Sequence, residues 1–564
     1  YDKNGNQTKI VNPLGEETRF TYNKRNQVKT MVKVVPVINE AGKKEIKELT
    51  TTYYYDKLGR VLKVEDPQGR SVSYQYIKKD DKEIQIQKDG KGNVVATNTY
   101  DYDGNLESTQ DSNGAKAGVV NTKYNYDVSG ALTSTTTYKN KEHKVTTTYK
   151  YDALNRLTDV IDPLNGVSSY TYDEVGNIKS IKDPNEGTKE YKYDGCGNVV
   201  KTIDTYKHEE NYTYNALNLL ETKEDRNKNT TKYTYDAIGR IKTIQDEEGT
   251  IRYEYDANSN ITKVSENKNG KTNTIEREYD ALNRVTKYKD YQGNTVRYGY
   301  DELGNRISLT YPGGESVRYE YDQSGLLTKV IDWNGDVTSY TRDENGRITK
   351  ENKPDGTTTT YQYDTLGQLT KQVAKKADKT ILYVQTYQYD LAGNVIKSQK
   401  QTGAKVNYDA LTTINMTYDS ENRLATYNGQ EVTYDDNGNM IYGPLDGKMT
   451  TFTYDVRNRL ISAGNQRYEY DAENNRIATT TIHYQDVKEA DNTAGKEKNS
   501  GKNDTKEETT AIQGITTHYV YDTNQELSQV LLEETEGATE VTETKYLYGK
   551  GLIAEETKRK SNKK

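Results

Sequence analysis

Aspartate directly follows tyrosine many times in this chain of 564 residues, and these carboxylates are its most numerous candidates for chemistry. General acid–base catalysis by carboxylates needs two groups whose different environments separate their pKa values. An aspartate that recurs in the same local sequence has no such unequal partner. We therefore predict that these aspartates close turns, and that the chain has no catalytic residue and is not itself an enzyme. The pair occurs at Tyr151-Asp152, Tyr172-Asp173, Tyr193-Asp194, Tyr235-Asp236 and Tyr300-Asp301, and as Tyr-Asn at Tyr214.

Metal binding is the second chemistry to consider, because the chain has 4 histidines and many Asp-x-x-Gly segments. The histidines lie in different parts of the chain, and only His483 and His518 are expected to meet, across one hairpin. No cysteine or third ligand stands near them at zinc-site spacing. The Asp-x-x-Gly segments follow neither the EF-hand nor the nonapeptide calcium pattern. We predict no metal site and no cofactor.

Cys196 and Trp333 each occur once, and both stand at turn positions. No histidine is near Cys196 in the sequence to activate it as a nucleophile, so we interpret it as an inert surface thiol. Trp333 replaces a proline that other copies of the turn have, and we expect it to pack on a neighbouring turn rather than to bind a partner. No phosphate-binding loop or nucleophile elbow is present.

The composition is unusual for a folded protein. Apolar residues make up 32% of the chain and charged residues 29%, values that approach those of disordered proteins. The 52 tyrosines reverse that interpretation, because each can bury roughly 150 to 250 Å² while its hydroxyl finds a partner. The net charge of −7, with both signs interspersed, predicts no nucleic-acid surface. The sequence has no apolar run long enough to predict a membrane span, and its single cysteine excludes an internal disulfide.

The elements that position these residues repeat with a fixed period. Tyr151, Tyr172, Tyr193, Tyr214 and Tyr235 begin the same motif and follow one another at intervals of 21 residues. A fixed period of roughly 20 to 50 residues is typical of repeat proteins, in which short units stack on their neighbours. We therefore predict one long solenoid rather than several globular domains, and no copy that holds a privileged site.

Each copy is predicted to be a β-hairpin. Tyr170 and Tyr172 are two residues apart, so they share one face of a strand. The segment from Asp173 to Gly176 is a turn, because aspartate bonds its own following backbone and glycine accepts positive φ. We call this the Tyr-Asp turn. Glycine holds the same position at Gly176, Gly197, Gly239 and Gly304.

A second strand and a second turn complete each copy. Ile178 and Ile181 belong to the second strand, but a spacing of three places them on opposite faces unless a β-bulge intervenes. Proline presets the backbone for a turn and is excluded from central strands, so it marks the second turn. The prolines that fall there are Pro13, Pro67, Pro163, Pro184, Pro312 and Pro354.

The domain prediction follows the copies along the chain. We predict an all-β hairpin solenoid over residues 1–484, most regular at 124–400. Residues 485–513 are rich in Lys, Glu, Asn and Asp, and we expect a flexible charged loop inserted at the tip of a hairpin. The last copies of the solenoid are expected at 514–557, followed by a solvated basic tail at 558–564.

The motif resembles the YD repeat of the RHS family. Tyr170–Ile178 and Tyr298–Arg306 both follow its pattern Tyr-x-Tyr-Asp-x-x-Gly-Asn followed by Arg, Leu or Ile. The resemblance covers essentially the whole chain outside the charged loop. It implies that the hairpins spiral into a long curved sheet that closes into a hollow shell around a C-terminal toxin domain. Teneurins and insecticidal toxin-complex components have related shells.

The resemblance also implies a setting. Many lysines and a single cysteine make the chain most similar to wall-associated RHS proteins of Gram-positive bacteria. This implies a secreted or wall-associated protein, cytoplasmic before export, that acts in interbacterial competition with a toxin domain and its immunity protein as partners. Tyr546–Ile553 resembles a family segment that precedes further copies and a motif tied to autoproteolysis. We expect that motif, the toxin and any export signal to lie outside this sequence, which we interpret as a piece of a longer protein.

A glycan-binding or wall-binding surface module is the alternative. Aromatic hairpin repeats of about 20 residues also occur in cell-wall-binding proteins, where the rings stack on sugars. Those sites usually use tryptophan, whereas this chain has 1 tryptophan and 52 tyrosines. Tyrosine flanked by threonine and charged residues is more typical of a cross-strand ladder.

Overall fold

The computed structural model describes residues 1–38, 44–138, 141–322, 324–364, 366–390, 393–402, 413–486, 509–537 and 540–561. All the elements in this part of the chain are strands except one short helix, which confirms the all-β prediction. The helix α1 (Ser112–Ala117) was not predicted. It begins after Asp111, whose side chain accepts a hydrogen bond from Gly114 N at 2.8 Å. No helix in the described ranges is long and apolar enough to cross a bilayer.

One antiparallel sheet of 35 strands takes up most of the chain, and each of its strands pairs with the next in sequence. Its strands are β1 (Lys9–Val11), β2 (Glu17–Tyr22), β3 (Val28–Ile38), β4 (Lys44–Tyr55), β5 (Val61–Glu65), β6 (Ser71–Lys79), β7 (Lys82–Lys88), β8 (Val94–Tyr100), β9 (Leu106–Gln110), β10 (Thr122–Tyr126), β11 (Leu132–Tyr138), β12 (Lys144–Tyr151), β13 (Leu157–Ile161), β14 (Val167–Tyr172), β15 (Ile178–Lys182), β16 (Thr188–Tyr193), β17 (Val199–Ile203), β18 (Glu209–Tyr214), β19 (Leu220–Glu224), β20 (Thr230–Tyr235), β21 (Ile241–Gln245), β22 (Thr250–Tyr255), β23 (Ile261–Lys268), β24 (Lys271–Tyr279), β25 (Val285–Lys289), β26 (Thr295–Tyr300), β27 (Arg306–Thr310), β28 (Ser316–Tyr321), β29 (Leu327–Ile331), β30 (Val337–Arg342), β31 (Ile348–Asn352), β32 (Thr358–Tyr363), β33 (Leu369–Lys375), β34 (Ile381–Tyr389) and β35 (Val395–Thr402).

Two smaller antiparallel sheets follow, with 3 and 10 strands. The first contains β36 (Met416–Tyr418), β37 (Leu424–Tyr427) and β38 (Gln430–Glu431). The second contains β39 (Thr433–Tyr434), β40 (Met440–Leu445), β41 (Lys448–Tyr454), β42 (Leu460–Ala463), β43 (Gln466–Tyr470), β44 (Arg476–Asp486), β45 (Thr509–Asp522), β46 (Gln529–Glu536), β47 (Glu540–Tyr548) and β48 (Leu552–Ser561).

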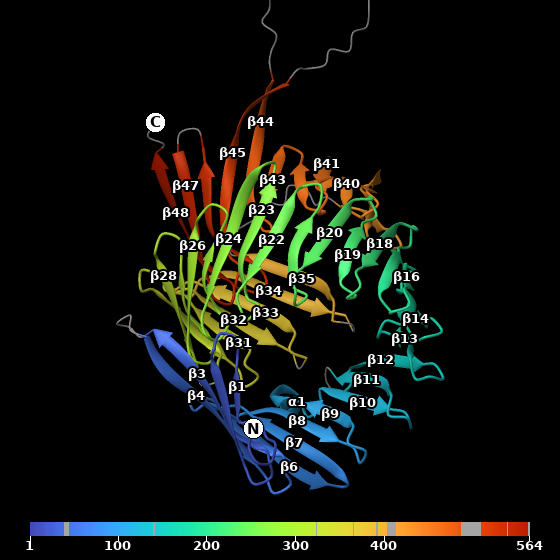
Figure 1. Cartoon of the computed structure of the whole chain (residues 1–564), viewed down its shortest axis with the longest axis vertical. Helices are drawn as coiled ribbons and strands as arrows, with labels where there is room; N and C mark the ends of the chain where they lie inside the picture. The colour runs from blue at the N-terminus through green and yellow to red at the C-terminus, as the bar shows by residue number, and fades with distance from the viewer. Residues whose placement is uncertain are drawn as a thin grey trace, which may run out of the picture.

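The sheets follow a spiral. In Figure 1 the chain rises from β1–β8 at the bottom, along β10–β16 on the right, to β18–β24 at the top. It then descends through β28–β34, whose turns reach the region of β3 and β4, before β40–β48 return along the top. Strands in a sheet are rotated relative to each other by roughly 20 to 25°, and this twist accumulates over many hairpins. The hairpin solenoid therefore curves back beside its own earlier copies.

A β-bulge beside each Tyr-Asp turn explains why apolar residues of the second strand, such as Ile178 and Ile181, are three residues apart. Tyr170 pairs with Ile181, whereas Tyr172 pairs with Ile178, and the register shifts between Thr171 and Tyr172. One extra residue in the second strand therefore brings both isoleucines to the face that carries the tyrosines. Similar shifts occur beside the tyrosines of neighbouring copies.

The best-packed core lies where the strands β22–β31 meet the C-terminal copies. Tyr298 and Tyr319 are 5% and 6% exposed there, and they belong to one cluster with Val520 and Leu531. The equivalent Tyr191 in an earlier copy is only half-buried. The tyrosine face is thus a closed core only where later copies cover it.

Two predictions near the C-terminus need correction. Strand β44 pairs with β45 from Ala478 opposite His518 to Asp486 opposite Thr509, so the hairpin arms reach into the predicted loop 485–513. The remainder of that loop, 487–508, lies outside the described residues. His483 is opposite Ile512 rather than His518, so the expectation that the two histidines meet is wrong.

The predicted basic tail is partly a strand. Lys558 and Lys560 belong to β48, opposite Glu543 and Val541 of β47. Lys560 Nζ lies 3.1 Å from Glu543 Oε2. The acidic residues of β47 therefore give the basic segment a partner strand that composition alone did not indicate, while 562–564 lie outside the described residues.

Candidate functional site: the Tyr-Asp turn and the seam

The Tyr-Asp turn has the same geometry in each copy that the sequence singled out. The carboxylate of Asp173 accepts hydrogen bonds from Val175 N at 3.1 Å and Asn177 N at 2.8 Å. Gly176 N donates to Asp173 O at 3.2 Å, and its φ of 97° lies in the region that favours glycine. Equivalent bonds are made by Asp152, Asp194, Asp236 and Asp301, and positive φ recurs at Gly197, Gly239 and Gly304.

These bonds stabilise the charged form of the aspartates. The side chain and backbone of Asn198 both donate to Asp194 and hold the pKa of that carboxyl below its usual value. At Asp152 the donors are the backbone and side chain of Arg156, with the same effect on the pKa. Because these aspartates share one environment, they form no pair with separated pKa values.

The second tyrosine of most copies links its copy to the one before. Tyr193 OH donates to the backbone carbonyl of Ile178 at 2.8 Å, one hairpin earlier. The hydroxyl therefore donates to a backbone carbonyl beside the preceding Tyr-Asp turn, while the ring covers the sheet. The same bond joins Tyr151 to Leu132, Tyr172 to Leu157, Tyr214 to Val199, Tyr235 to Leu220 and Tyr300 to Val285.

An arginine that the sequence analysis missed adds to this link. Arg156, four residues after Asp152, donates from Nε to the carboxylate at 2.8 Å. Its guanidinium carbon lies 4.6 Å from the ring centroid of Tyr172 in the next copy. Arg240 stands over Tyr255 in the same way, at 4.4 Å. In the sequence, this second link is indicated by an arginine, instead of an asparagine, four residues after the turn aspartate.

Copies far apart in sequence meet along what we call the seam, where Tyr-Asp turns of later copies contact earlier hairpins, mostly at their second turns. Glu302 accepts from Lys47 Nζ at 2.8 Å and from Gln68 Nε2 at 2.9 Å. One hairpin further on, Lys91 Nζ lies 2.6 Å from Asp322. The bonds of Lys47 and Gln68 lower the pKa of Glu302. Such contacts join residues 181 to 255 positions apart, which is roughly one circuit of the spiral.

The seam continues under the C-terminal copies, where its contacts are more buried. Arg457 Nε lies 2.6 Å from Asp246, and its Nη1 lies 2.5 Å from Glu266. Arg277 forms an ion pair with Glu473 at 2.5 Å. These contacts join the second circuit to the first through charged groups that are mostly buried.

One position of the Tyr-Asp turn provides many of these contacts, and we call it the third residue because it is two after the aspartate. Glu421 accepts from Thr205 N at 3.2 Å, and Asn437 accepts from Arg226 N at 2.9 Å. In the copies of the C-terminal sheets this residue is polar and bonded, at Glu421, Asn437, Arg457, Glu473 and Asn524. Several earlier copies have an apolar residue at this position, such as Leu154 and Val175, so its polarity in the C-terminal copies is a signal in the sequence that could have indicated the seam but was missed.

Asp471 is a buried turn aspartate with a raised pKa. It is 2% exposed, and burial raises its pKa to about 6. A carboxyl that titrates near neutral pH suits an acid catalyst. Asp471 nevertheless makes the ordinary turn bonds to Glu473 N and Asn475 N, both at 2.9 Å, and is sealed from solvent. Its role is therefore structural.

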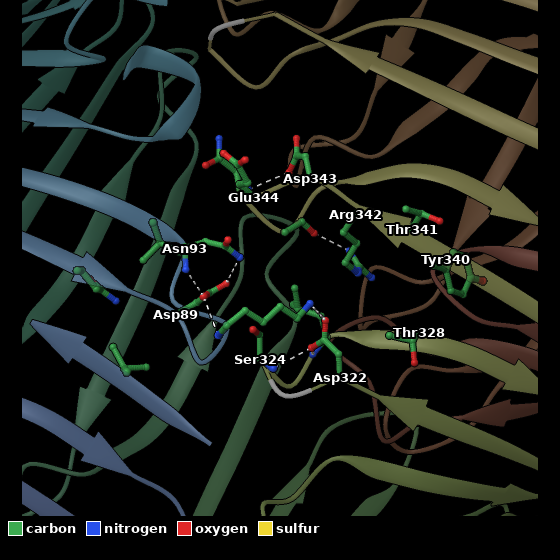
Figure 2. Close-up of a pocket in the computed structure, with 17 residues that line it drawn as sticks. Asp89, Asn93, Asp322, Ser324, Thr328, Tyr340, Thr341, Arg342, Asp343 and Glu344 are labelled. Atoms are coloured by element: carbon green, nitrogen blue, oxygen red, sulfur yellow. Dashed lines mark hydrogen bonds and ion pairs between the residues drawn. The ribbon is translucent and has the colours of Figure 1, made fainter. Parts of the chain in front are cut away.

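The seam opens into a cavity of about 640 Å³ between the β6–β8 region and β29–β31 (Figure 2). Arg342, which replaces the second tyrosine in its copy, lines the cavity and donates from Nη2 to Leu327 O at 3.2 Å, the bond that tyrosine makes elsewhere. Asp322 and Glu344 also line it, but each has a lysine partner, Lys91 and Lys116. The lining combines apolar residues such as Val72 and Leu326 with charged residues, and the carboxylates Asp322 and Glu344 are paired within the wall.

The single tryptophan and the described histidines have structural partners. Trp333 Nε1 donates to Glu556 at 3.1 Å, and its ring meets Tyr311 edge-on at 5.4 Å between centroids. His208 lies 3.1 Å from Asp204 within one turn, and His518 lies 2.9 Å from Gln292. Cys196 is exposed. In the described part of the chain no three metal-ligating side chains come together.

This spiral of hairpins joined by a seam defines a class of shell protein, and the family comparison identifies it. The model of the teneurin YD-shell matches residues 77–253, 207–357, 247–408 and 355–488, and the RHS repeat model matches 1–34. The shell matches together span more than half of the chain. The chain therefore belongs to the teneurin YD-shell family, and the resemblance to RHS repeats is confirmed.

One solved structure supports the same fold. The crystal structure of TcdB2-TccC3 matches 98% of this chain with a TM-score of 0.50 and 13% sequence identity, and the present chain spans 38% of that longer chain. The Tc holotoxin pore of Photorhabdus luminescens matches 97% of this chain and 31% of its own, with a TM-score of 0.31 and 14% identity. At such identity the TcdB2-TccC3 match shows the fold alone. No curated protein matches the chain in sequence.

Proposed function

We propose that this chain is a non-enzymatic part of a shell wall that encloses a toxin domain C-terminal to it and helps to deliver that toxin in competition between bacteria. The seam is the observation that carries the proposal. A repeat array that only displayed binding sites would not need charged turns bonded to turns roughly one circuit away, such as Arg457 to Asp246. A wall that must stay closed around a cargo does need them.

Two further observations support an enclosing role. The turn carboxylates are bonded to their own backbone, so their repetition builds the wall rather than a row of reactive groups. The family resemblance implies a C-terminal toxin inside such shells, and the fold likeness to TcdB2-TccC3 agrees with that. The same proposal implies an immunity protein that binds the toxin, and a secreted or wall-associated location after export.

The test uses the complete reading frame that contains these 564 residues, purified as one protein. We expect electron microscopy to show density inside the wall, and limited proteolysis to spare the segment that follows Lys564. The matched variant Arg457→Met removes the pairs with Asp246 and Glu266 and should expose that segment to the protease. A following segment that lies outside the wall and is cleaved at the same rate in both proteins would contradict enclosure.

The glycan-binding alternative is less well supported. Trp333 is held in the seam by Glu556, and tyrosines such as Tyr193 and Tyr214 use their hydroxyls on backbone carbonyls. These side chains are therefore already engaged within the wall. A pull-down on purified peptidoglycan tests this alternative directly, and saturable binding that is lost when the exposed Tyr102 is changed to alanine would favour it.

A further inference from the structure

One copy of the repeat departs from its neighbours at the cavity in the seam. Arg342 stands where neighbouring copies have the second tyrosine, such as Tyr321 and Tyr363. Its Nη2 donates to Leu327 O at 3.2 Å, much as Tyr321 OH donates to Arg306 O at 2.9 Å. The replacement therefore keeps the link between copies but exchanges an aromatic ring for a cation.

A second replacement accompanies the first, at the turn before it. In the next copy the residue four after the turn aspartate is Arg347, whose guanidinium carbon lies 4.8 Å from the ring centroid of Tyr363. The equivalent residue before Arg342 is Leu326, which also lines the cavity. An arginine at 326 would lie close to Arg342 and repel it. The two replacements therefore fit each other.

Arg342 has no counter-charge. It is partly buried, and in the described part of the chain it forms no ion pair with a carboxylate. Its two hydrogen bonds go to neutral backbone carbonyls, those of Gly346 at 2.6 Å and Leu327. An arginine has five N–H donors, so one hydrogen on Nη1 and one on Nη2 remain after these bonds. A sequence that breaks its own local rule without a compensating contact most often does so at a functional site.

The carboxylates of the lining are already engaged. Three of them form ion pairs with basic side chains of the wall at 2.6 to 2.9 Å: Asp322 with Lys91, Asp343 with Arg347 and Glu344 with Lys116. The fourth, Asp89, accepts hydrogen bonds from its own turn, including two from Asn93 at 2.8 and 3.0 Å. Of the two cations in the lining, Lys91 therefore has a carboxylate partner and Arg342 has none.

Apolar side chains share the cavity with this cation. Val72 and Val95 of the first circuit and Leu326 of the second contribute hydrocarbon surface to the lining. Figure 2 shows Arg342 on the opposite side of the cavity from Asp89. The volume of about 640 Å³ lies within the range of small-molecule sites, which combine apolar walls with a few polar groups. A ligand in this cavity would contact both circuits.

These features select the chemistry of a ligand. A guanidinium binds a planar carboxylate through two parallel hydrogen bonds. One cation without a counter-charge suits a single negative charge, and the valines and the leucine suit an apolar body. Inorganic phosphate fits less well, because it has no apolar body and brings more than one negative charge close to the carboxylates of the lining.

We propose that this cavity binds a small organic acid, a single carboxylate on an apolar body. The carboxylate accepts from the Nη groups of Arg342, and the body lies against Val72, Val95 and Leu326. Because these residues come from both circuits, the bound acid joins the circuits across the seam. A ligand that binds only the closed seam lowers its open fraction by a factor of 1 + [L]/Kd, about tenfold at ten times the Kd.

Benzoate is the probe, added to the 564-residue chain. We expect calorimetric titration to show one saturable site with a Kd of about 1 mM or below. Amide hydrogen exchange in β6–β8 and β29–β31 should slow as benzoate is added, by about tenfold at ten times the Kd. Benzamide has a similar shape without the charge, and inorganic phosphate has charge without the ring. Both should bind at least about tenfold more weakly than benzoate.

Variants of Arg342 test whether the site is the one proposed. Arg342→Tyr gives this copy the residue of its neighbours, so the fold should persist while benzoate affinity falls by about tenfold or more. Arg342→Gln also removes the charge and should lower the affinity similarly, which guards against a local rearrangement in the first variant. Arg252→Gln is the control, because Arg252 is exposed on β22 and is not part of the lining, and it should bind benzoate like the wild type.

Three results would overturn the proposal. The first is the absence of saturable benzoate binding, and the second is benzamide that binds as tightly as benzoate. The third is an Arg342→Tyr variant that binds benzoate like the wild type, because Arg342 would then hold only the backbone carbonyls of its own and the preceding copy.

Discussion

Arg457 and Asp246 are 211 residues apart in sequence, yet Nε of the arginine lies 2.6 Å from the aspartate carboxylate in the seam. Their side chains are 12% and 5% exposed. Breaking a buried ion pair costs about 3 to 5 kcal/mol, because the remaining charge stays buried without a partner. We expect Arg457→Met to destabilise the seam by about that amount, measured as faster amide hydrogen exchange in β21–β23 and β41–β42.

The matched control for this variant is an exposed pair on the same wall. Lys329 Nζ lies 2.7 Å from Glu320, and both side chains are nearly half exposed. Exposed pairs contribute about 0 to 1 kcal/mol. Lys329→Met should therefore change hydrogen exchange little, and an equal effect from both variants would mean that burial of the seam does not govern its strength.

Removing a tyrosine hydroxyl tests the link between neighbouring copies. Tyr193→Phe keeps the ring but loses the bond to Ile178 O, at a cost of about 1 kcal/mol. Because unfolding of a repeat array is not two-state, the measurement is local hydrogen exchange in β15–β17. The exposed Tyr102 provides the comparison, since Tyr102→Phe should have no effect.

The chain itself supplies the control for a turn glycine. Gly176 has a φ of 97°, whereas Asn155 and Asn218 occupy the equivalent position of other copies at 60° and 57°. A residue with a Cβ in the left-handed region costs about 1 to 2 kcal/mol, and asparagine tolerates that region best. Gly176→Val should destabilise the hairpin more than Gly176→Asn, as judged by local hydrogen exchange in β14 and β15. Equal losses would show that φ is not the constraint at this turn.

Acid is expected to strengthen one part of the seam. Burial raises the pKa of Asp471 from 3.8 to about 6, so the folded state favours the neutral carboxyl. The stability from this group is complete below the unfolded pKa and is lost as the pH rises through about 6. Between pH 7 and pH 4 the gain is up to about 3 kcal/mol. Asp471→Asn should remove this pH dependence of hydrogen exchange in β43 and β44.

Other seam carboxylates have the opposite dependence. Lys47 lowers the pKa of Glu302, and Lys545 lowers that of Glu315. The stability that these groups contribute is present above their unfolded pKa values and is lost as the pH falls through the folded values, below about 4. Hydrogen exchange at β3–β4 and β47 should therefore accelerate in strong acid, and Glu302→Gln should remove the effect at β3–β4.

The single tryptophan reports on the docking of the C-terminal copies. Trp333 contacts Glu556 and Tyr311, and Lys545 forms an ion pair with Glu315 of the neighbouring second turn. Lys545 is 7% exposed, so Lys545→Met leaves Glu315 without its partner. We expect the red shift of tryptophan emission to occur at lower denaturant than in the wild type, while hydrogen exchange in β12–β20 is unchanged. A coincident shift in both regions would indicate one cooperative unit instead.

Much of the local structure could be predicted from the sequence. The interval of 21 residues indicated the hairpin, Pro184 its second turn, and the spacing of Ile178 and Ile181 a possible bulge, which the register between Thr171 and Tyr172 confirms. These features depend on groups a few residues apart, so local chemistry is sufficient to specify them. The helix α1 and the strand at Lys558–Lys560 were missed because each depends on partners contributed by other segments.

The sequence by itself determined the repeat, the turn chemistry and the family resemblance, because each depends on residues within one or two copies. Only the tertiary structure decided which copies meet. Whether Arg457 lies beside Asp246 depends on twist accumulated over roughly ten hairpins. No single copy encodes the accumulated twist, so the role of the third residue of the turn became clear only when the spiral placed it in the seam.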